Sequence, residues 1–253
     1  MADIVSSAED KLFLSRIDDM VKLSEKRGAV YSHFLTEHEC IAAKAELDWM
    51  MHRNFCFYGI FDDAERKILC VYKEFFMPEN EDFPAVPVTF TFKKESKLSH
   101  RDFLGALMHL GIKREMVGDI VIDDGIAQIA LLKTVENIVA SEIRKIGNTG
   151  VKYNERFPGI LKKIQNFKEI SGTVASLRLD SAAGLALNLS RSKTAGLIKS
   201  AGIEVNSQPK YDCSLILNEG DVFSVRGYGK FKLSEISGMT KKGRIHITVL
   251  KYC

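Results

Sequence analysis

The sequence predicts an α+β protein with three consecutive parts: an N-terminal region of helices and a hairpin, a central α+β domain, and a small C-terminal domain with two helices on a short sheet. Apolar residues recur at helical spacing in some segments and alternate as in strands in others. Capping and turn residues separate these segments. Changes of composition near residues 87 and 170 place the domains at 1–87, 88–170 and 171–253.

The N-terminal part contains two expected helices and one hairpin. Residues 8–27 have apolar residues at helical spacing, and a glycine follows as a helix stop. Thr36 and Glu39 have the spacing of a capping box, which predicts the start of a second helix. Strand-like runs at 55–61 and 67–72 flank a polar turn and predict a hairpin.

The central part begins after a proline-rich stretch at 78–87. Residues 88–92 alternate as in a strand, and Ser99 is expected to cap a helix over 100–110.

Two strands are then expected around an Asp-Asp-Gly turn, at 120–122 and 127–132, followed by a helix over 135–146 and a strand near 151–153. This order of elements is that of ferredoxin-like and RRM-like domains. The RNP1 pattern of RNA-binding RRMs is absent here, so the order alone does not predict RNA binding.

The C-terminal part contains a short helix around 179–189 and a second helix over 191–200, which Ser190 is placed to cap and Gly202 to end. Three short strands are expected after it, at 203–206, 214–217 and 221–225.

The start of the second helix combines groups that bind phosphate. Ser190, Arg191, Ser192 and Lys193 bring two hydroxyls and two cations to a helix N-terminus, where unpaired N–H groups and the positive end of the helix dipole also lie. An ordinary capped surface helix would have the same residues, so the spacing leaves both interpretations open.

A second basic segment follows the strand at 221–225. Arg226, Lys230 and Lys232 surround Tyr228 between two glycines. The cations suit contact with phosphates, while Tyr228 suits either stacking on an unpaired base or packing within a turn.

Charge is distributed unevenly along the chain. Residues 1–89 contain 10 Lys and Arg against 17 Asp and Glu, residues 90–170 contain 14 against 10, and residues 171–253 contain 12 against 6. A basic end beside an acidic one is a feature of nucleic-acid-binding proteins, because only the basic end attracts phosphate.

Short blocks of residues occur in a particular order and spacing between residues 176 and 225: Leu177-Arg178-Leu179-Asp180, Ser190-Arg191-Ser192-Lys193, Leu197-Ile198, Gly202, Val205-Asn206, Gly220-Asp221 and Val225. This pattern resembles the alpha-L RNA-binding motif of a small-subunit ribosomal protein, pseudouridine synthases and bacterial tyrosyl-tRNA synthetases. The resemblance implies that side chains such as Arg178, Arg191 and Lys193 face the backbone of folded RNA.

Further blocks extend the likeness over nearly the whole chain: Phe34-Leu35-Thr36, His100 to Met108, Gly111-Ile112, Gly118-Asp119-Ile120 and Arg226 to Phe231. They resemble the YlmH-type proteins of Gram-positive bacteria. The resemblance implies a role in ribosome-associated quality control, in which the protein binds the large ribosomal subunit with peptidyl-tRNA. The implied partners are rRNA, tRNA and a factor that adds an untemplated tail to the stalled nascent chain, with the protein acting as a monomer.

The candidate RNA-binding residues are the polar and basic side chains of these C-terminal segments: Arg178, Ser190, Arg191, Ser192, Lys193, Lys199, Asn206, Lys210, Arg226, Tyr228, Lys230 and Lys232.

No enzyme, metal or cofactor site is expected. The five cysteines form no C-x-x-C pair, and the spacing of His33, His38 and Cys40 matches no usual zinc site. The glycine-rich phosphate-binding loop of nucleotide-binding enzymes and the H-E-x-x-H motif of metalloproteases are absent. The N-terminus lacks the pattern of a signal peptide and no apolar run is long enough to span a bilayer, so we expect a cytoplasmic protein without a membrane anchor.

Two alternatives remain. Arg178-Leu179-Asp180 resembles the loop that carries the catalytic aspartate of RNA pseudouridine synthases, although Asp180 would equally suit a helix cap and only 73 residues follow it. The acidic region 1–89 could instead make the protein an adaptor that binds another protein.

Overall fold

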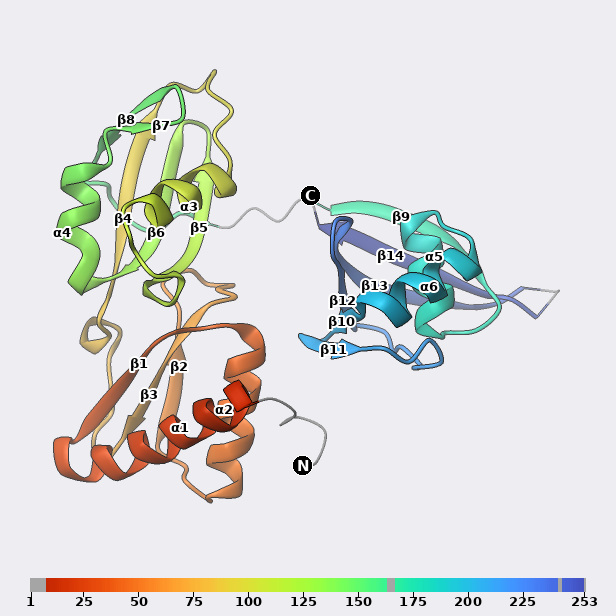
Figure 1. The fold of residues 1–253 in the computed structure, drawn as a ribbon, viewed down its shortest axis with the longest axis horizontal. Coiled ribbons are helices and arrows are strands. Elements are labelled where there is room, and N and C mark those ends of the chain that lie inside the picture. The colour runs from red at the N-terminus through yellow and green to blue at the C-terminus, as the bar shows by residue number, and fades with distance from the viewer. Residues whose placement is uncertain (1–7, 163–166, 241–242, 253) are drawn as a thin grey trace. The chain divides into compact units, whose positions relative to one another are not determined.

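The structure of the chain is a computed structural model that describes residues 8–162, 167–240 and 243–252. It consists of two compact units, Met1–Lys163 and Ile164–Cys253 (Figure 1). Helices and sheets occur in both, which confirms the α+β class. The first unit contains both the N-terminal and the central part, and the boundary expected between them at residue 87 stays a prediction. Within the described ranges, no helix is long and apolar enough to cross a bilayer.

The N-terminal region is a three-stranded antiparallel sheet with two helices, α1 (Ala8–Arg27) and α2 (Glu37–Trp49). The predicted capping box starts α2: the Thr36 hydroxyl accepts a hydrogen bond from Glu39 N at 3.2 Å, and the Glu39 carboxylate accepts one from Thr36 N at 2.7 Å. The strands lie in the order β1-β3-β2, with β1 at Ala29–Leu35, β2 at Phe55–Tyr58 and β3 at Lys67–Tyr72. The hairpin of β2 and β3 was predicted, with a first strand three residues too long, whereas β1 was missed.

Strand β3 is buried on both faces. Leu69 and Val71 belong to a small core with Ile17 of α1. Ile68 and Cys70, which alternate with them, belong to a larger core that continues into the central sheet. The N-terminal and central parts therefore share one continuous core.

The central part has the ferredoxin-like order that the sequence predicts. Its main elements are β4 (Ala85–Phe92), α3 (His100–His109), β5 (Val117–Asp123), β6 (Ile126–Leu132), α4 (Lys133–Glu142) and β8 (Thr149–Tyr153). The strands lie in the order β5-β6-β4-β8, all antiparallel to their neighbours, and a short strand β7 (Lys145–Ile146) extends the edge beyond β8. Two single-turn 3₁₀ helices, η1 (Asn80–Asp82) and η2 (Arg114–Met116), precede β4 and β5. The prediction of a helix up to residue 146 was wrong, because the chain leaves α4 after Glu142 and turns into the β7–β8 hairpin.

The two faces of the central sheet are covered by different parts of the chain. Phe90 and Phe92 pack against Phe103 of α3 on the helix side. On the other face Thr89 and Gln128 are 3% and 1% exposed.

That second face is closed by two segments. Gln128 accepts a hydrogen bond from Leu161 N at 2.8 Å, so the chain that follows β8 crosses it. A Cβ at Gly118 would lie 2.7 Å from the ring of Phe34 and 2.8 Å from the Cβ of Ala130, so the N-terminal region packs directly on this face as well.

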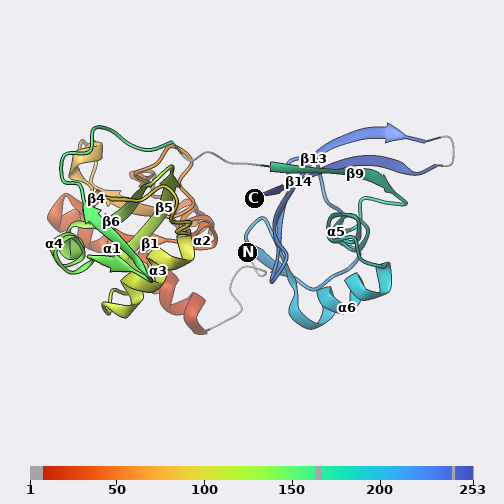
Figure 2. The same cartoon turned by 90° about the horizontal axis from the view of Figure 1, so that it is seen from above.

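The C-terminal unit is a six-stranded antiparallel sheet with two helices on one face (Figure 2). Its elements are β9 (Phe167–Val174), α5 (Leu179–Leu187), α6 (Arg191–Ala201), β10 (Ile203–Val205), β11 (Gln208–Lys210), β12 (Val222–Val225), β13 (Gly229–Met239) and β14 (Ile245–Tyr252), and the sheet order is β11-β10-β12-β13-β14-β9. Both predicted helices are present, and Gly202 ends α6 with φ of +73°.

The sheet is larger than the short one predicted, because β9, β11, β13 and β14 were missed. The strand expected at 214–217 is absent; only one isolated bridge, between Arg178 and Ile216, occurs in that segment. The segment expected as a basic loop after residue 225 is a β-hairpin, so Lys230 and Lys232 are strand residues.

Candidate nucleic-acid interface

The start of α6 has the geometry of a phosphate-binding site. Ser190 is the N-cap, and its hydroxyl accepts a long hydrogen bond, 3.5 Å, from Lys193 N. The hydroxyls of Ser190 and Ser192 lie 3.3 Å apart. Ser190, Arg191, Ser192 and Lys193 are all exposed, so this helix end, with its unpaired N–H groups, is open to a ligand.

A buried carboxylate connects the two helices of the unit. Asp180, 3% exposed, is the second residue of α5. Its Oδ1 accepts from Arg178 Nε at 3.2 Å, and its Oδ2 accepts from Arg191 Nε at 3.1 Å. Ser181 donates to the same carboxylate at 3.2 Å. The aspartate thus fixes Arg191 through Nε alone. Because the Arg191 side chain is 64% exposed, its two Nη groups remain available to bind phosphate oxygens.

The ionised form of Asp180 is favoured despite its burial. Burial acts to raise the pKa of the carboxyl, but the hydrogen bonds from Arg178, Arg191 and Ser181 outweigh it and hold the pKa below its ordinary value. The side chain does not cap α5 as the sequence suggested, because the N-cap position belongs to Arg178 and no side-chain cap bond forms there. Its role in this structure is to position two arginines.

A groove of about 470 Å³ lies beside this network. Arg191 and Asp180 contribute to its lining, and so does Arg244, the residue before β14. Arg244 is exposed and donates to the Thr173 hydroxyl at 3.0 Å. Sequence reasoning missed Arg244, although the basic run at 241–244 was a visible signal. The groove therefore brings together two arginines that are 53 positions apart in the sequence.

The second predicted basic segment lies on another surface. Phe231 and Leu233 of β13 are buried in the core beneath the helices. Because strand residues alternate between faces, Lys230 and Lys232 lie on the face of the sheet opposite α5 and α6. Lys230 Nζ lies 5.4 Å from the centre of the Tyr252 ring. The structure therefore does not bring these lysines together with Arg191 and Lys193.

The tip of the same hairpin is formed by Arg226 and Tyr228. Tyr228 N donates to Val225 O at 3.0 Å, and φ is +85° at Gly227 and +112° at Gly229. Tyr228 is 40% exposed and Arg226 is exposed, so both side chains can reach a ligand.

The three remaining predicted residues are dispersed. Lys199 is exposed in the last turn of α6, and Lys210 is half-buried on β11. Asn206 lies in the turn between β10 and β11 and is hydrogen-bonded to the start of β12: its Nδ2 donates to Asp221 Oδ1 at 2.8 Å, and its Oδ1 accepts from Val222 N at 2.9 Å. Both polar atoms of the Asn206 side chain are therefore already hydrogen-bonded within the protein, and an RNA contact would have to compete with these bonds.

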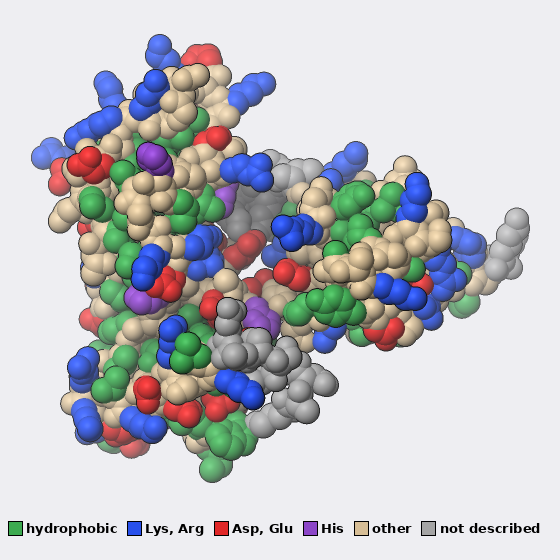
Figure 3. Space-filling model, viewed as in Figure 1, with side chains coloured by type: hydrophobic (Ala, Val, Ile, Leu, Met, Phe, Trp, Pro, Cys, Tyr) green, Lys and Arg blue, Asp and Glu red, His purple; other side chains and the backbone are tan. Residues whose placement is uncertain are grey.

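The net charge of the C-terminal unit attracts anions. Residues 164–253 contain 13 Lys and Arg against 7 Asp and Glu, a net charge of +6. Lys and Arg side chains are spread over the visible face of the unit in Figure 3. An open helix start, two exposed arginines along a groove and a positive field are together suited to binding a phosphate backbone.

Comparisons with known proteins concern both units. Residues 78–157, which comprise the ferredoxin-like part, match the family model described as "Putative RNA-binding domain in YlmH". This match lies outside the C-terminal unit, where the sequence had led us to expect the RNA contacts. The ribosome-associated protein quality control protein P2 of Bacillus subtilis is 34% identical to the chain over an alignment of 203 residues, and the alignment covers 77% of this chain and 77% of that protein.

A solved structure of the cell division protein ylmH from Streptococcus pneumoniae is 24% identical, with a TM-score of 0.49 over 59% of this chain and 93% of that one. The identity and coverage of the Bacillus relative, together with the family match, are sufficient to place the sequence. The chain belongs to the family of YlmH-type ribosome-associated quality-control proteins.

Proposed function

We propose that the protein binds folded RNA on the ribosome and acts without catalysing a reaction. The observation that carries this proposal is the Arg178–Asp180–Arg191 network, which holds Arg191 exposed at an open helix N-terminus beside Lys193. A preorganised arginine loses less side-chain entropy when it binds a phosphate than a freely rotating one does. Such contacts select RNA by the position of its phosphates and carry no sequence information directly.

The Bacillus relative provides the biological context, since its name describes a ribosome-associated quality-control protein. By that relationship we propose that the RNA is rRNA and tRNA, on a large ribosomal subunit that holds peptidyl-tRNA. The protein would act in the cytoplasm as a monomer and support a factor that adds an untemplated tail to the stalled chain.

The alternative of a pseudouridine synthase has little support in the geometry. Asp180, the residue that would be catalytic, is 3% exposed, and its carboxylate is occupied by Arg178, Arg191 and Ser181. A catalytic aspartate must reach its substrate, so here the carboxylate is better explained as a positioning group for the arginines.

Gradient sedimentation of cell lysate tests the proposal. We expect the tagged wild-type protein to migrate with large ribosomal subunits at moderate salt, and the Arg191→Ala/Lys193→Ala variant to remain near the top. A matched Lys73→Ala/Lys113→Ala variant removes the same charge from exposed positions of the first unit and should migrate like the wild type. Wild-type protein that stays at the top of the gradient would remove the ribosomal role.

A further inference from the structure

The ferredoxin-like part raises the question of which of its surfaces meets RNA. RRM domains stack bases on exposed aromatic residues of the sheet face that their helices leave free. Here that face is closed by Phe34 and by the segment that contains Leu161, and its central residues Thr89 and Gln128 are buried. An RNA contact by this part must therefore use another surface.

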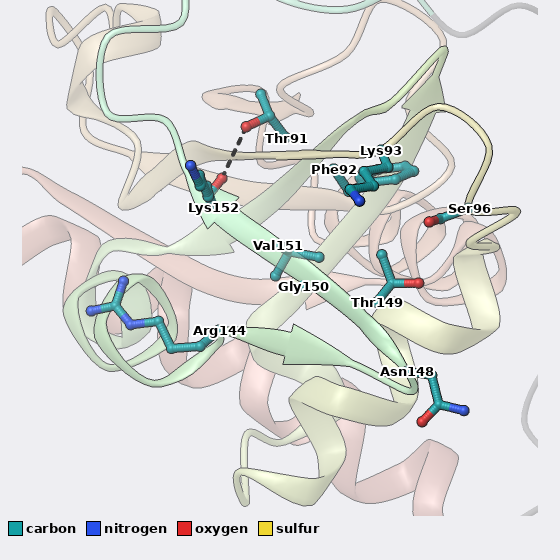
Figure 4. Close-up of a pocket in the computed structure, with 10 residues that line it drawn as sticks. All are labelled: Thr91, Phe92, Lys93, Ser96, Arg144, Asn148, Thr149, Gly150, Val151 and Lys152. Carbon is teal, nitrogen blue, oxygen red and sulfur yellow. Dashed lines mark hydrogen bonds between the residues drawn. The ribbon is translucent and has the colours of Figure 1, made fainter.

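The edge of the same sheet has an open groove of about 650 Å³ (Figure 4). Three segments form it: the end of β4 with the loop that follows, Arg144 between α4 and β7, and the β7–β8 hairpin. Thr91 and Lys152 lie opposite each other on β4 and β8, and the Thr91 hydroxyl donates to Lys152 O at 3.5 Å. This volume is larger than a single phosphate needs and is in the range of small-molecule sites.

Among the residues that the structure describes, the groove lining contains three cations, neutral polar side chains and the apolar Phe92 and Val151, but no carboxylate. Lys93, Arg144 and Lys152 each come from a different segment, and all three are exposed. None of them forms an ion pair with any residue in the described part of the chain. The adjacent Lys94 differs, because it is paired with Asp124. Figure 3 shows Lys and Arg side chains gathered at the end of the unit where β7 and β8 lie.

The uncharged polar residues of the lining suit an anionic ligand, as the cations do. Ser96, Asn148 and Thr149 supply hydroxyl and amide groups that can donate to phosphate oxygens. Gly150 is exposed, and a Cβ there would meet no heavy atom within 4 Å, so the backbone at this position is open to a ligand. Among the described residues these three cations have no ion-pair partner and no carboxylate beside them in the lining, so with the neutral donors they are expected to attract an anion.

We propose that this groove binds phosphate groups of an RNA backbone and is a second RNA contact, separate from the start of α6. The proposal deepens the proposed function and rests on it. It identifies which surface of residues 78–157 contacts RNA: the edge at β4 and β8 and not the sheet face. Because the contacts are made to phosphates, RNA shape should matter more than base sequence.

The test measures binding of the full-length chain to a fluorescently labelled RNA stem-loop over a series of salt concentrations. The Lys93→Gln/Arg144→Gln/Lys152→Gln variant removes the three groove cations. Each phosphate contact contributes roughly 0.7 to 0.9 to the slope of log K against log salt, so the slope should fall by about 2 to 3. The matched control, Lys73→Gln/Arg101→Gln/Lys113→Gln, removes three exposed cations of the same unit that do not line the groove. In this control the slope of log K against log salt should fall much less than in the groove variant.

Each outcome has a separate meaning. If the groove variant binds like the wild type while Arg191→Ala/Lys193→Ala weakens binding, the groove is not an RNA site and the proposed function stands. If the wild type does not bind RNA at all, both proposals are wrong. Equal losses in the groove variant and its control would show a general charge effect and overturn the groove proposal.

A competition arm separates RNA from a small nucleotide, since both present the same phosphate chemistry. A large excess of AMP should leave RNA binding nearly unchanged if the groove holds several phosphates of a chain. If the wild type binds AMP, the groove variant does not, and RNA binding is the same in both, the groove is a nucleotide site and not an RNA contact.

Discussion

Salt dependence gives the sharpest test of the α6 site. Arg191→Ala/Lys193→Ala removes two cations, which at roughly 0.9 per duplex phosphate should lower the slope of log K against log salt by about 1.8. Between 50 and 200 mM salt, a fourfold change, the ratio of wild-type to variant affinity should therefore fall about 12-fold. Fluorescence anisotropy with a labelled RNA stem-loop measures both quantities.

Folding must be checked separately, because Arg191 also bonds to Asp180. The carboxylate keeps Arg178 and Ser181 as partners in the variant, so the thermal midpoint should change little. A matched Lys230→Ala/Lys232→Ala variant removes the same charge from the opposite face of the sheet. Loss of affinity with an unchanged slope would contradict phosphate contact at Arg191 and Lys193, and an equal slope change in both variants would show that the two faces contribute alike.

Three further predictions concern stability. In Asp180→Asn, we expect a lower urea midpoint than wild type at neutral pH. The difference in urea midpoint between wild type and variant should disappear as the pH falls below about 4. The reason is that a carboxylate whose pKa is lowered in the folded protein stabilises the fold at pH values above its unfolded pKa, and this stabilisation is lost when the carboxylate is protonated. A difference that does not change with pH would contradict this role of Asp180. Gly118→Ala should reduce the free energy of unfolding, measured by urea titration, by about 1–3 kcal/mol, because the new Cβ would lie 2.7 Å from the Phe34 ring. The control Gly105→Ala lies in α3 with open space around it and should raise the free energy of unfolding by about 0.5–1 kcal/mol. Thr36→Ala should cost about 1 kcal/mol through loss of the α2 cap, and no change in the urea midpoint would contradict that assignment.

Features that depend on nearby residues were predictable from the sequence. The caps at Thr36 and Ser99 each need a hydroxyl at the N-cap and a carboxylate three residues later. The cap at Ser190 needs only a hydroxyl that accepts from a backbone N–H of the first helical turn. The turn between β5 and β6 needs positive φ, and Asp124 and Gly125 have φ of +37° and +85°. These choices are made within a few residues, so a local pattern identifies them.

Features that depend on distant pairing were missed. Strand β14 pairs with β9 over eight residues from Ile245 to Tyr252, and its partner lies more than 70 positions earlier. The alternation of apolar residues in this segment does not by itself predict a strand in this sheet, because the partner strand that makes one face buried is not known from nearby residues. The end of α4 failed for a related reason: Ile143 and Ile146 continue a helical spacing, but the hairpin with β8 buries both in an extended segment.

The candidate sites divide in the same way. The residues at the α6 start were found because they are adjacent in sequence and lie at a helix end. Arg244 joins their groove only through the pairing of β14 with β9. Lys93, Arg144 and Lys152 line one groove only because β4, β8 and β7 are neighbours in the central sheet. No sequence pattern connects such positions in the absence of the fold.

The acidic N-terminal region explains why the second RNA contact should lie at an edge. Residues 1–89 carry a net charge of −7 and pack, through Phe34, on the face of the central sheet that RRM domains use for RNA. Phe34 of this region covers the face sterically, and the net charge of the region as a whole does not attract phosphate. The groove at β4 and β8 has no carboxylate in its lining and lies at the end of the unit away from β1, β2 and β3 (Figure 1). Packing therefore covers the sheet face, which is why we propose that RNA contacts the groove at β4 and β8 instead.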